Sequence, residues 1–283
     1  MIRLAVRCRP QDAEPVLASL LELAPNGVEE DRGPDWVEYA IYGGPGEVPD
    51  LGEVKAASGE ATVEVTTTSV PDDWADRWAD FHKPIEVAGR LAVRPSWWDA
   101  REGLIDVVID PGRAFGTGAH ATTRLCLELL IELESGGEAG GPLADWGTGS
   151  GVLGIAAAKL GWGPVTGCDR EQSSLEAAAE NAAANGVGMA VERMDVREGP
   201  LPLAPTVSAN LTAPLLRACA AQLAAGEERP QVLVCSGMLV READEVSASF
   251  AEAGLAEHDR RTDGDWAALL LRSSGRPRLR GAA

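Results

Sequence analysis

A glycine-rich turn between a short apolar run and a helix-forming run constrains this chain most. The turn reads Ala144-Asp145-Trp146-Gly147-Thr148-Gly149-Ser150-Gly151, and the helical run extends from Val152 to Leu160. Three glycines in five residues let the backbone turn tightly and let a ligand approach the main chain. The next predicted strand, Pro164 to Cys168, leads into Asp169, eighteen residues after Gly151. An acidic residue about 20 positions beyond such a turn typically hydrogen-bonds the ribose hydroxyls of a nucleotide-like ligand.

The turn alone does not identify the ligand. Gly149, Gly151 and Gly154 also satisfy the G-x-G-x-x-G pattern of dinucleotide-binding folds. The pattern therefore leaves two candidates, a nicotinamide dinucleotide and S-adenosylmethionine. The succession of strand, turn, helix, strand and acidic residue favours a nucleoside of one of these two kinds over a turn that serves only to pack a strand on a helix.

The segments beyond the turn predict a doubly wound sheet. Strand-like runs and helical runs alternate, with helices expected at Leu175–Asn185 and at 239–253 and strands at 191–196, 206–210 and 232–237. Ligands of such sheets bind outside the carboxyl ends of the strands, so Asn210 is expected in the same crevice as Gly147 and Asp169. Asp195 is a candidate for reading the adenine amino group. Two final runs, 256–261 and 266–271, predict a closing hairpin at the sheet edge, which methyltransferase sheets have and dinucleotide folds lack.

A second informative stretch precedes the glycine turn. Residues 110–120 read Asp-Pro-Gly-Arg-Ala-Phe-Gly-Thr-Gly-Ala-His, a loop with three glycines, one aromatic residue and one histidine. A helix is expected to begin near Thr122 and Thr123. The amides and hydroxyls at that helix start can meet a carboxylate, and the methionine carboxylate of S-adenosylmethionine is one candidate.

Residues 1–70 are predicted to form a separate small α+β domain of ferredoxin-like type. Strands are expected at 2–6, 35–42 and 61–68, and a helix at 13–23. This segment carries no catalytic constellation, so a binding role is the better interpretation. Residues 71–95 are expected to link it to a catalytic domain at 96–272.

The link is expected to hold a helix and one connecting strand, and a second strand follows it. Trp74, Trp78 and Phe81 form one stripe of that helix, and strands are expected at 85–93 and 104–109. The basic tail, residues 273–283, is predicted to be disordered.

Composition narrows the function classes. The chain has 283 residues and a net charge of −19, which argues against a nucleic-acid interface and permits a basic protein partner. No apolar run reaches the length of a membrane span, and no signal peptide opens the chain, so a cytoplasmic protein is expected. The five cysteines are scattered and only three histidines occur, which favours buried reduced thiols and no metal site. A monomer is the default expectation.

Several stretches together resemble the PrmA family of ribosomal-protein methyltransferases, whose target is the eleventh protein of the large ribosomal subunit. The matching stretches are Trp74–Pro84, Asp110–Thr123, Asp145–Gly151, Gly167–Asp169, Asn181–Gly186, Asn210, Ser236-Gly237-Met238-Leu239 and the strand at Trp266. The stretch Asp-Pro-Gly-x-Ala-Phe-Gly-Thr-Gly-x-His is the most distinctive of them. The chain departs from the family at Ala119 and Ala121, where Thr and Pro are usual, and residues 1–70 resemble the family in size and element order alone.

The resemblance implies a fold, a cofactor and a set of site residues. The fold is a class I methyltransferase Rossmann-like sheet of seven strands with a small N-terminal domain, and the cofactor is S-adenosyl-L-methionine. The implied cofactor-binding residues are Thr123, Gly147, Gly149, Asp169 and Asn210, with Phe115, Thr117, Gly118 and His120 in a loop over the reacting methyl group. The implied substrate is a basic ribosomal protein, methylated on lysine side chains, on its N-terminal α-amine, or on both.

We expect catalysis by alignment of an amine with the methyl carbon and by exclusion of water. The Asn210 side chain and the backbone carbonyl that follows it are expected to orient the amine, and His120 is a candidate proton acceptor. Three alternatives stay open: a methyltransferase for another protein or a small amine, a nicotinamide-dependent oxidoreductase, and a binding module that kept the fold without the activity.

Overall fold

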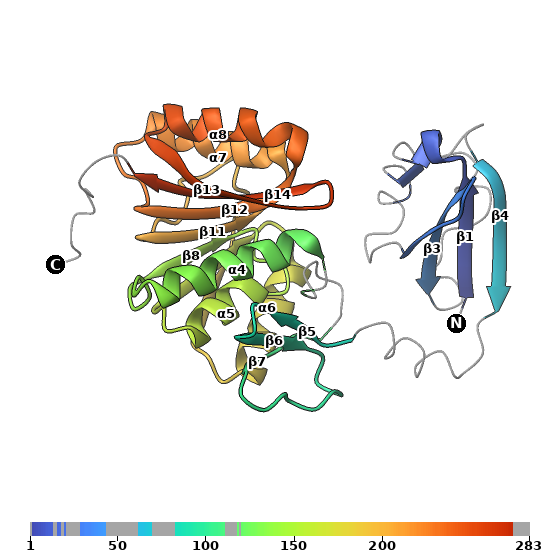
Figure 1. Ribbon diagram of the computed structural model, residues 1–283, viewed down its shortest axis with the longest axis horizontal. Coiled ribbons are helices and arrows are strands. Elements are labelled where there is room, and N and C mark those ends of the chain that lie inside the picture. The colour runs from blue at the N-terminus through green and yellow to red at the C-terminus, as the bar shows by residue number, and fades with distance from the viewer. Residues whose placement is uncertain are drawn as a thin grey trace. The chain divides into compact units, whose positions relative to one another are not determined.

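The computed structural model of the protein describes residues 2–13, 16, 17, 20, 29–43, 62–69, 83–110, 118 and 120–273. Contacts divide the chain into two units, Met1–Phe81 and His82–Ala283 (Figure 1). The predicted helix with Trp74, Trp78 and Phe81 lies outside the described residues, and so does the tail after Ser273.

The first unit contains a four-stranded antiparallel sheet in the order β2-β3-β1-β4. Its strands are β1 (Ile2–Cys8), β2 (Glu29–Arg32), β3 (Val37–Gly43) and β4 (Thr62–Ser69). Alternate residues of β1 and β3 face one core, which also holds helical Val16 and Leu20. The sequence did not predict β2, because its residues Glu-Glu-Asp-Arg show no apolar alternation. The ferredoxin-like interpretation stays a prediction, since residues 44–61 lie outside the described part of the chain.

The second unit contains a seven-stranded sheet in the order β10-β9-β8-β11-β12-β14-β13. The strands are β8 (Leu143–Trp146), β9 (Val165–Asp169), β10 (Met189–Arg193), β11 (Thr206–Asn210), β12 (Val232–Leu239), β13 (Leu255–Asp263) and β14 (Trp266–Ser273). The strands from β10 to β12 are parallel, and β14 pairs antiparallel with both β12 and β13. This topology confirms the predicted α/β fold class and the closing hairpin.

Helices cover both faces of this sheet (Figure 1). They are α4 (Ala121–Ser135), α5 (Val152–Lys159), α6 (Gln172–Ala184), α7 (Ala213–Ala225) and α8 (Ala243–Glu252), with a 3-10 turn at Val240–Glu242. Val232 and Val234 of β12 pack in the core with α4 and α5, whereas Leu233 and Cys235 pack in the core with α7 and α8. Because both faces are covered, the strand is a continuous apolar run rather than an alternating one.

A small three-stranded sheet, β5-β6-β7, packs against the α4 and α5 side of the core. Its strands are β5 (Ile85–Val87), β6 (Leu91–Arg94) and β7 (Ile105–Val108). The prediction of one strand over residues 85–93 is therefore wrong. A turn at 88–90, with φ of 50° at Ala88 and 63° at Gly89, folds that segment into an antiparallel hairpin.

The sheet order reverses beside β8. The chain proceeds from β8 to β9 and β10 on one side and returns to β11 on the other side of β8. At such a reversal the loops that follow neighbouring strands separate and leave a crevice at the carboxyl edge of the sheet. The loops after β8, β9 and β11 begin at Gly147, Arg170 and Leu211, so the expected site residues meet there.

The five cysteines are free and buried, which confirms the expectation of reduced internal thiols. In the part of the chain that the structure describes, none of the helices is both long and apolar enough to span a bilayer.

Candidate functional site

The glycine turn after β8 is held by backbone hydrogen bonds to the neighbouring strand. The amides of Gly147 and Thr148 both donate to the carbonyl of Cys168, each at 2.9 Å. Gly147 has φ of +68°, and a Cβ on it would lie 2.3 Å from Cδ2 of Leu211. A side chain here would be strained by the positive φ and would also displace the Leu211 side chain, which explains why glycine occupies this position.

Asp169 stands at the end of β9 with its carboxylate against this turn. Its Oδ2 accepts a hydrogen bond from the amide of Gly149 at 3.0 Å, and its Oδ1 accepts one from the amide of Glu171 at 3.0 Å. These two bonds fix the direction of the carboxylate at the carboxyl edge. An ionised carboxylate has about four acceptor positions, so acceptor capacity remains for the hydroxyls of a ribose.

A second acidic residue, in the strand before the turn, holds the turn in place. Asp145 of β8 is 1% exposed, and it accepts hydrogen bonds from Thr148 Oγ1 at 2.6 Å and Ser208 Oγ at 2.7 Å. Burial raises the pKa of the Asp145 carboxyl, and these hydrogen bonds oppose the shift. Asp145 thus links the turn to β11 through hydrogen bonds, and its buried carboxylate does not line the crevice.

The crevice is a cavity of about 250 Å³ at the carboxyl ends of β8, β9, β10 and β11. Its wall combines backbone, polar and apolar groups: Gly147, Gly149, Asp169, Arg170, Ser174, Met194, Asp195, Val196, Asn210, Leu211 and Leu215. Gly147, Gly149, Asp169 and Asn210 are the cofactor-binding residues that the family resemblance implied. The apolar side chains of Met194, Val196 and Leu215 were not predicted, although their positions just past β10 and in the first turn of α7 could have indicated them.

Asp195 also lines the cavity, two residues after β10 ends at Arg193, so the predicted strand 191–196 began two residues too late and ended three residues too late. Its carboxylate accepts hydrogen bonds from the amide of Arg197 at 3.0 Å and from the Arg197 guanidinium. These contacts hold the pKa of Asp195 below its ordinary value. The proposed adenine-reading role of Asp195 stays a prediction.

Asn210 faces the cavity from the end of β11. Its Nδ2 donates a hydrogen bond to Oγ1 of Thr123 at 3.3 Å, and Thr123 is fully buried in the first turn of α4. The structure therefore brings Thr123, an expected site residue 87 positions earlier in the chain, into contact with Asn210. Because Nδ2 is engaged with Thr123, Oδ1 is the atom of this amide that can accept a hydrogen bond from a ligand.

His120 forms the N-cap of α4. Its Nδ1 accepts a hydrogen bond from the Thr122 amide at 3.3 Å and lies 2.8 Å from Thr122 Oγ1. Its ring meets the Trp266 ring edge-on, with centroids 4.8 Å apart. Burial, aided by the nearby Arg124 cation, lowers the pKa of His120, which favours the neutral ring. With Nδ1 accepting, the neutral ring carries its proton on Nε2, so the geometry supports capping, and the role as proton acceptor stays a prediction.

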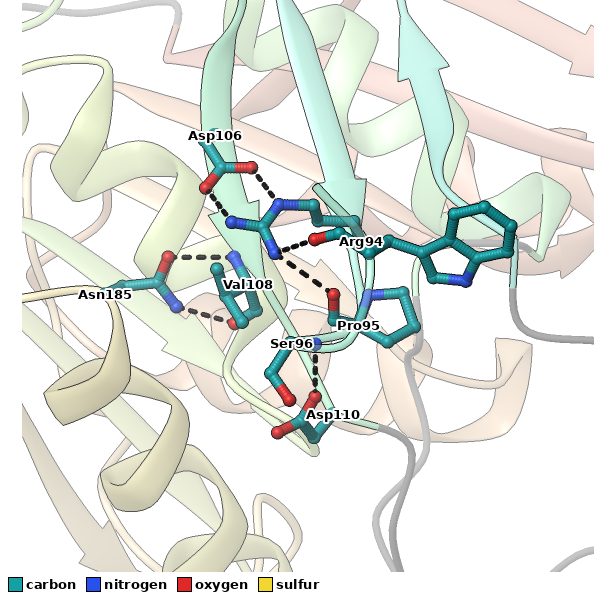
Figure 2. Close-up of polar contacts among 8 residues, drawn as sticks. Arg94, Pro95, Ser96, Asp106, Val108, Asp110 and Asn185 are labelled. Atoms are coloured by element: carbon teal, nitrogen blue, oxygen red, sulfur yellow. Dashed lines mark hydrogen bonds and ion pairs between the residues drawn. The ribbon is translucent and has the colours of Figure 1, made fainter. Parts of the chain in front are cut away.

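The described ends of the 110–120 loop are anchored to the small sheet and to α6. The carboxylate of Asp110 accepts a hydrogen bond from the Ser96 amide at 2.6 Å (Figure 2), and the Asp110 amide donates to Asn181 Oδ1 at 3.4 Å. Gly118 lies against Val93 of β6. Phe115 and Thr117, expected over the reacting methyl group, lie outside the described residues.

Figure 2 shows two further contacts near the start of the 110–120 loop. Asn185 bonds both backbone groups of Val108, at 2.9 Å to the amide and 2.6 Å to the carbonyl. Arg94 forms a two-point ion pair with Asp106, both bonds being 2.7 Å. The sequence analysis gave no role to Asn185 or Arg94, because their partners are backbone groups or residues on a neighbouring strand.

The cavity suits a nucleoside attached to an amino acid. Asp169 presents a carboxylate for ribose hydroxyls, and Met194, Val196 and Leu215 offer apolar surface for a base beside it. The turn has no side chain at Gly147 or Gly149, so a charged ligand can lie against the main chain. Among the described residues, no cluster of three or more His, Cys, Asp or Glu side chains is arranged to hold a metal.

Comparison with known proteins identifies the family. The sequence model described as ribosomal protein L11 methyltransferase (PrmA) matches residues 48–274. The chain belongs to the PrmA family. A ribosomal protein L11 methyltransferase of Pelotomaculum thermopropionicum is 40% identical over 224 aligned residues, and the match covers 76% of this chain and 70% of the relative. One of Chloroflexus aurantiacus is 37% identical and covers 73% of this chain and 71% of the relative.

A solved structure agrees with this membership of the PrmA family. The ribosomal protein L11 methylase of Lactobacillus delbrueckii subsp. bulgaricus superimposes with a TM-score of 0.60 at 29% identity. The match covers 68% of this chain and 99% of that chain. Together with the antiparallel strand β14, membership of the PrmA family removes the support for a nicotinamide-dependent oxidoreductase.

Proposed function

We propose that this protein transfers the methyl group of S-adenosyl-L-methionine to amine nitrogens of ribosomal protein L11. The observation that carries the proposal is the meeting of Gly147, Asp169 and Asn210 around one cavity in a chain of the PrmA family. The bound cofactor supplies a methyl group on a sulfonium, and this methyl group is already electrophilic. The protein therefore needs no nucleophilic residue of its own.

The remaining tasks of the protein are to bind the cofactor and to orient the acceptor amine, and different residues perform them. Asp169 and Gly149 hold the ribose side of the cofactor, and Met194, Val196 and Leu215 exclude water from its base. The amide Oδ1 of Asn210 and the backbone carbonyl of Leu211 accept hydrogen bonds from the acceptor amine and aim its lone pair at the methyl carbon. This alignment converts the encounter into a reaction within one complex.

The acceptor amine must be neutral when it reacts. A lysine amine has a reference pKa of about 10.4, so most of it is protonated near neutral pH. Water at the cavity mouth takes the proton, and the carbonyl and amide oxygens then hold the neutral amine. The finer assignment to lysine side chains, to the N-terminal α-amine or to both is part of this proposal, as is a cytoplasmic location of the protein.

The direct test uses tritiated S-adenosyl-L-methionine with purified ribosomal protein L11. Labelled L11 with the wild-type enzyme, and none with Asp169→Ala at the same cofactor concentration, is the expected result. Mass spectrometry of the labelled protein then assigns the modified amines. Binding of the cofactor without any labelling of L11 would contradict the proposed substrate.

A second candidate is a methyltransferase for a different protein or a small amine. The family match begins at residue 48, so the first 47 residues, part of the expected recognition domain, lie outside it. The same labelling experiment with a ribosome-free lysate separates the candidates. Another labelled protein band, or label that is soluble in acid, would favour the second one.

A further inference from the structure

The Ser236-Gly237 segment of β12 belongs to one of the stretches that resemble the PrmA family, and it has no role in the site as described so far. Ser236 pairs with Asn210 of β11 on one side and with Ala268 of β14 on the other, whereas Met238 pairs with Ala267. Gly237 is therefore an extra residue between two successive pairs, which is a β-bulge. Bulges bend a strand locally and are frequent next to active sites, where they direct a neighbouring group.

Gly237 of the bulge packs directly against the loop that follows Asn210. Gly237 has φ of +91°, and a Cβ built on it would lie 2.3, 2.7 and 2.9 Å from the O, C and N atoms of Leu211. All three contacts would be shorter than a real Cβ makes, and the atoms they meet belong to backbone rather than to a movable side chain. The Leu211 amide also donates to the Ser236 carbonyl at 3.0 Å. The backbone of Leu211 therefore packs directly against Gly237.

The bulge itself is fixed from the other side. Ser236 is fully buried, and its Oγ donates to the Ala267 carbonyl of β14 at 2.7 Å. Just beyond the bulge, the Val240 amide donates to the Asp265 carbonyl at 2.8 Å. Trp266 pairs with Leu239, and its ring contacts His120. The β12–β14 pair thus connects the loop after Asn210 with the start of α4.

We propose that the Ser236-Gly237 bulge is the positioning element of the acceptor site. It sets the place of the Leu211 carbonyl and, through the adjacent peptide, the direction of the Asn210 amide, and so it determines how the acceptor amine is aligned. This inference rests on the proposed function, because it assigns Asn210 and Leu211 to the amine. It gives the bulge no direct contact with the nucleoside, whose ribose is held by Asp169 and Gly149 and whose base is held by Met194, Val196 and Leu215.

The test compares Gly237→Ala with Gly264→Ala. Gly264 in the β13–β14 turn also has a positive φ, +56°, but a Cβ there would meet nothing within 4 Å. Both variants therefore carry the same kind of backbone strain, and only Gly237→Ala displaces Leu211. We expect kcat of Gly237→Ala to fall at least about 10-fold below that of Gly264→Ala, because a small misplacement of reacting groups costs up to about 100-fold. We expect the Kd for S-adenosyl-L-methionine to stay within about twofold of wild type, which separates positioning from cofactor binding.

Two outcomes would overturn the proposal. One is a kcat for Gly237→Ala equal to that of Gly264→Ala, and the other is a Kd for the cofactor that rises as much as kcat falls. If Gly237→Ala is recovered unfolded, Ser236→Ala carries the test, because it loosens the bulge and keeps the glycine. It should lower kcat about fivefold at unchanged cofactor Kd, and wild-type kcat would reject the inference. Failure of the proposed function is distinct, since the wild type and Gly264→Ala would then label no acceptor at all.

Discussion

On the β8–β9 side of the cavity, each group is held by the turn itself or by the adjacent strand, whereas on the β11–β12 side Asn210 is also held from α4, 87 residues earlier in the chain. The Gly147 amide donates to the Cys168 carbonyl of β9, and the Gly149 amide donates to the Asp169 carboxylate. Asn210 depends on Thr123, and Leu211 depends on Gly237. The nucleoside half is therefore held between two consecutive strands, and the acceptor half adds contacts to β12 and to α4.

The division between the two sides predicts separable defects. Changes on the β8–β9 side should weaken cofactor binding, and changes on the β11–β12 side should slow transfer at saturating cofactor.

The largest expected effect belongs to Asp169→Ala. Loss of a charged acceptor for ribose hydroxyls should raise the Kd for S-adenosyl-L-methionine about 100-fold, because hydrogen bonds to charged groups contribute about 1.5–3 kcal/mol. Isothermal titration calorimetry measures this Kd. Glu180→Ala, an exposed acidic residue of α6, is the control and should bind like wild type. Wild-type affinity of Asp169→Ala would remove the ribose assignment.

The next effect belongs to Asn210→Ala. At saturating cofactor, kcat should fall about 30-fold, since an acceptor that orients the amine is lost, and the cofactor Kd should change about threefold or less. Steady-state labelling of L11 gives kcat, and calorimetry gives Kd. Unchanged turnover would exclude Asn210 from the transfer step, and an equal loss in Kd would place it on the nucleoside side.

A smaller effect is expected for Thr123→Val, which removes the hydroxyl that accepts from Asn210 Nδ2. A neutral hydrogen bond contributes about 1 kcal/mol, so kcat should fall about fivefold. Thr206→Val is the matched control, because that buried hydroxyl accepts from Trp162 Nε1 at the opposite end of β11. Equal kcat values for the two variants would show that the Thr123 contact does not position Asn210.

The smallest effect concerns pH and His120. Burial depresses the pKa of the folded-state ring below its ordinary value near 6.5, so the unfolded chain binds the additional proton first. The contribution of His120 to the free energy of unfolding is therefore complete at pH values above the ordinary pKa. This contribution is lost as the pH falls from the ordinary pKa toward the folded-state pKa. His120→Asn keeps an N-cap residue without titrating. Between pH 7.5 and pH 5.5, the free energy of unfolding measured in urea should fall less for His120→Asn than for wild type. Equal decreases for the two proteins would contradict the depressed pKa of His120.

The same comparison explains how much could be predicted from the sequence. The glycine turn, Asp169 and the end of β11 follow from local spacing and hydrophobic pattern, because the strand, the turn and the acidic residue all lie between Leu143 and Asp169, and β11 is a short apolar run of its own. The hairpin at 85–94 was mistaken for one strand, since Ala88-Gly89 gives a weak turn signal inside an apolar run. The Gly237–Leu211 contact, the Asn210–Thr123 bond and the Asn185–Val108 pair had no local signal, because each joins segments that meet only when the sheet forms.

The central claim is that one cavity at the carboxyl edge, between the turn after β8 and the end of β11, binds the cofactor. A crystal structure with S-adenosyl-L-homocysteine tests it most directly. We predict ribose hydroxyls at about 2.7 Å from the Asp169 carboxylate and the sulfur on the Asn210 side of the Gly147 turn. A ligand bound away from Gly147 and Asp169 would contradict the account.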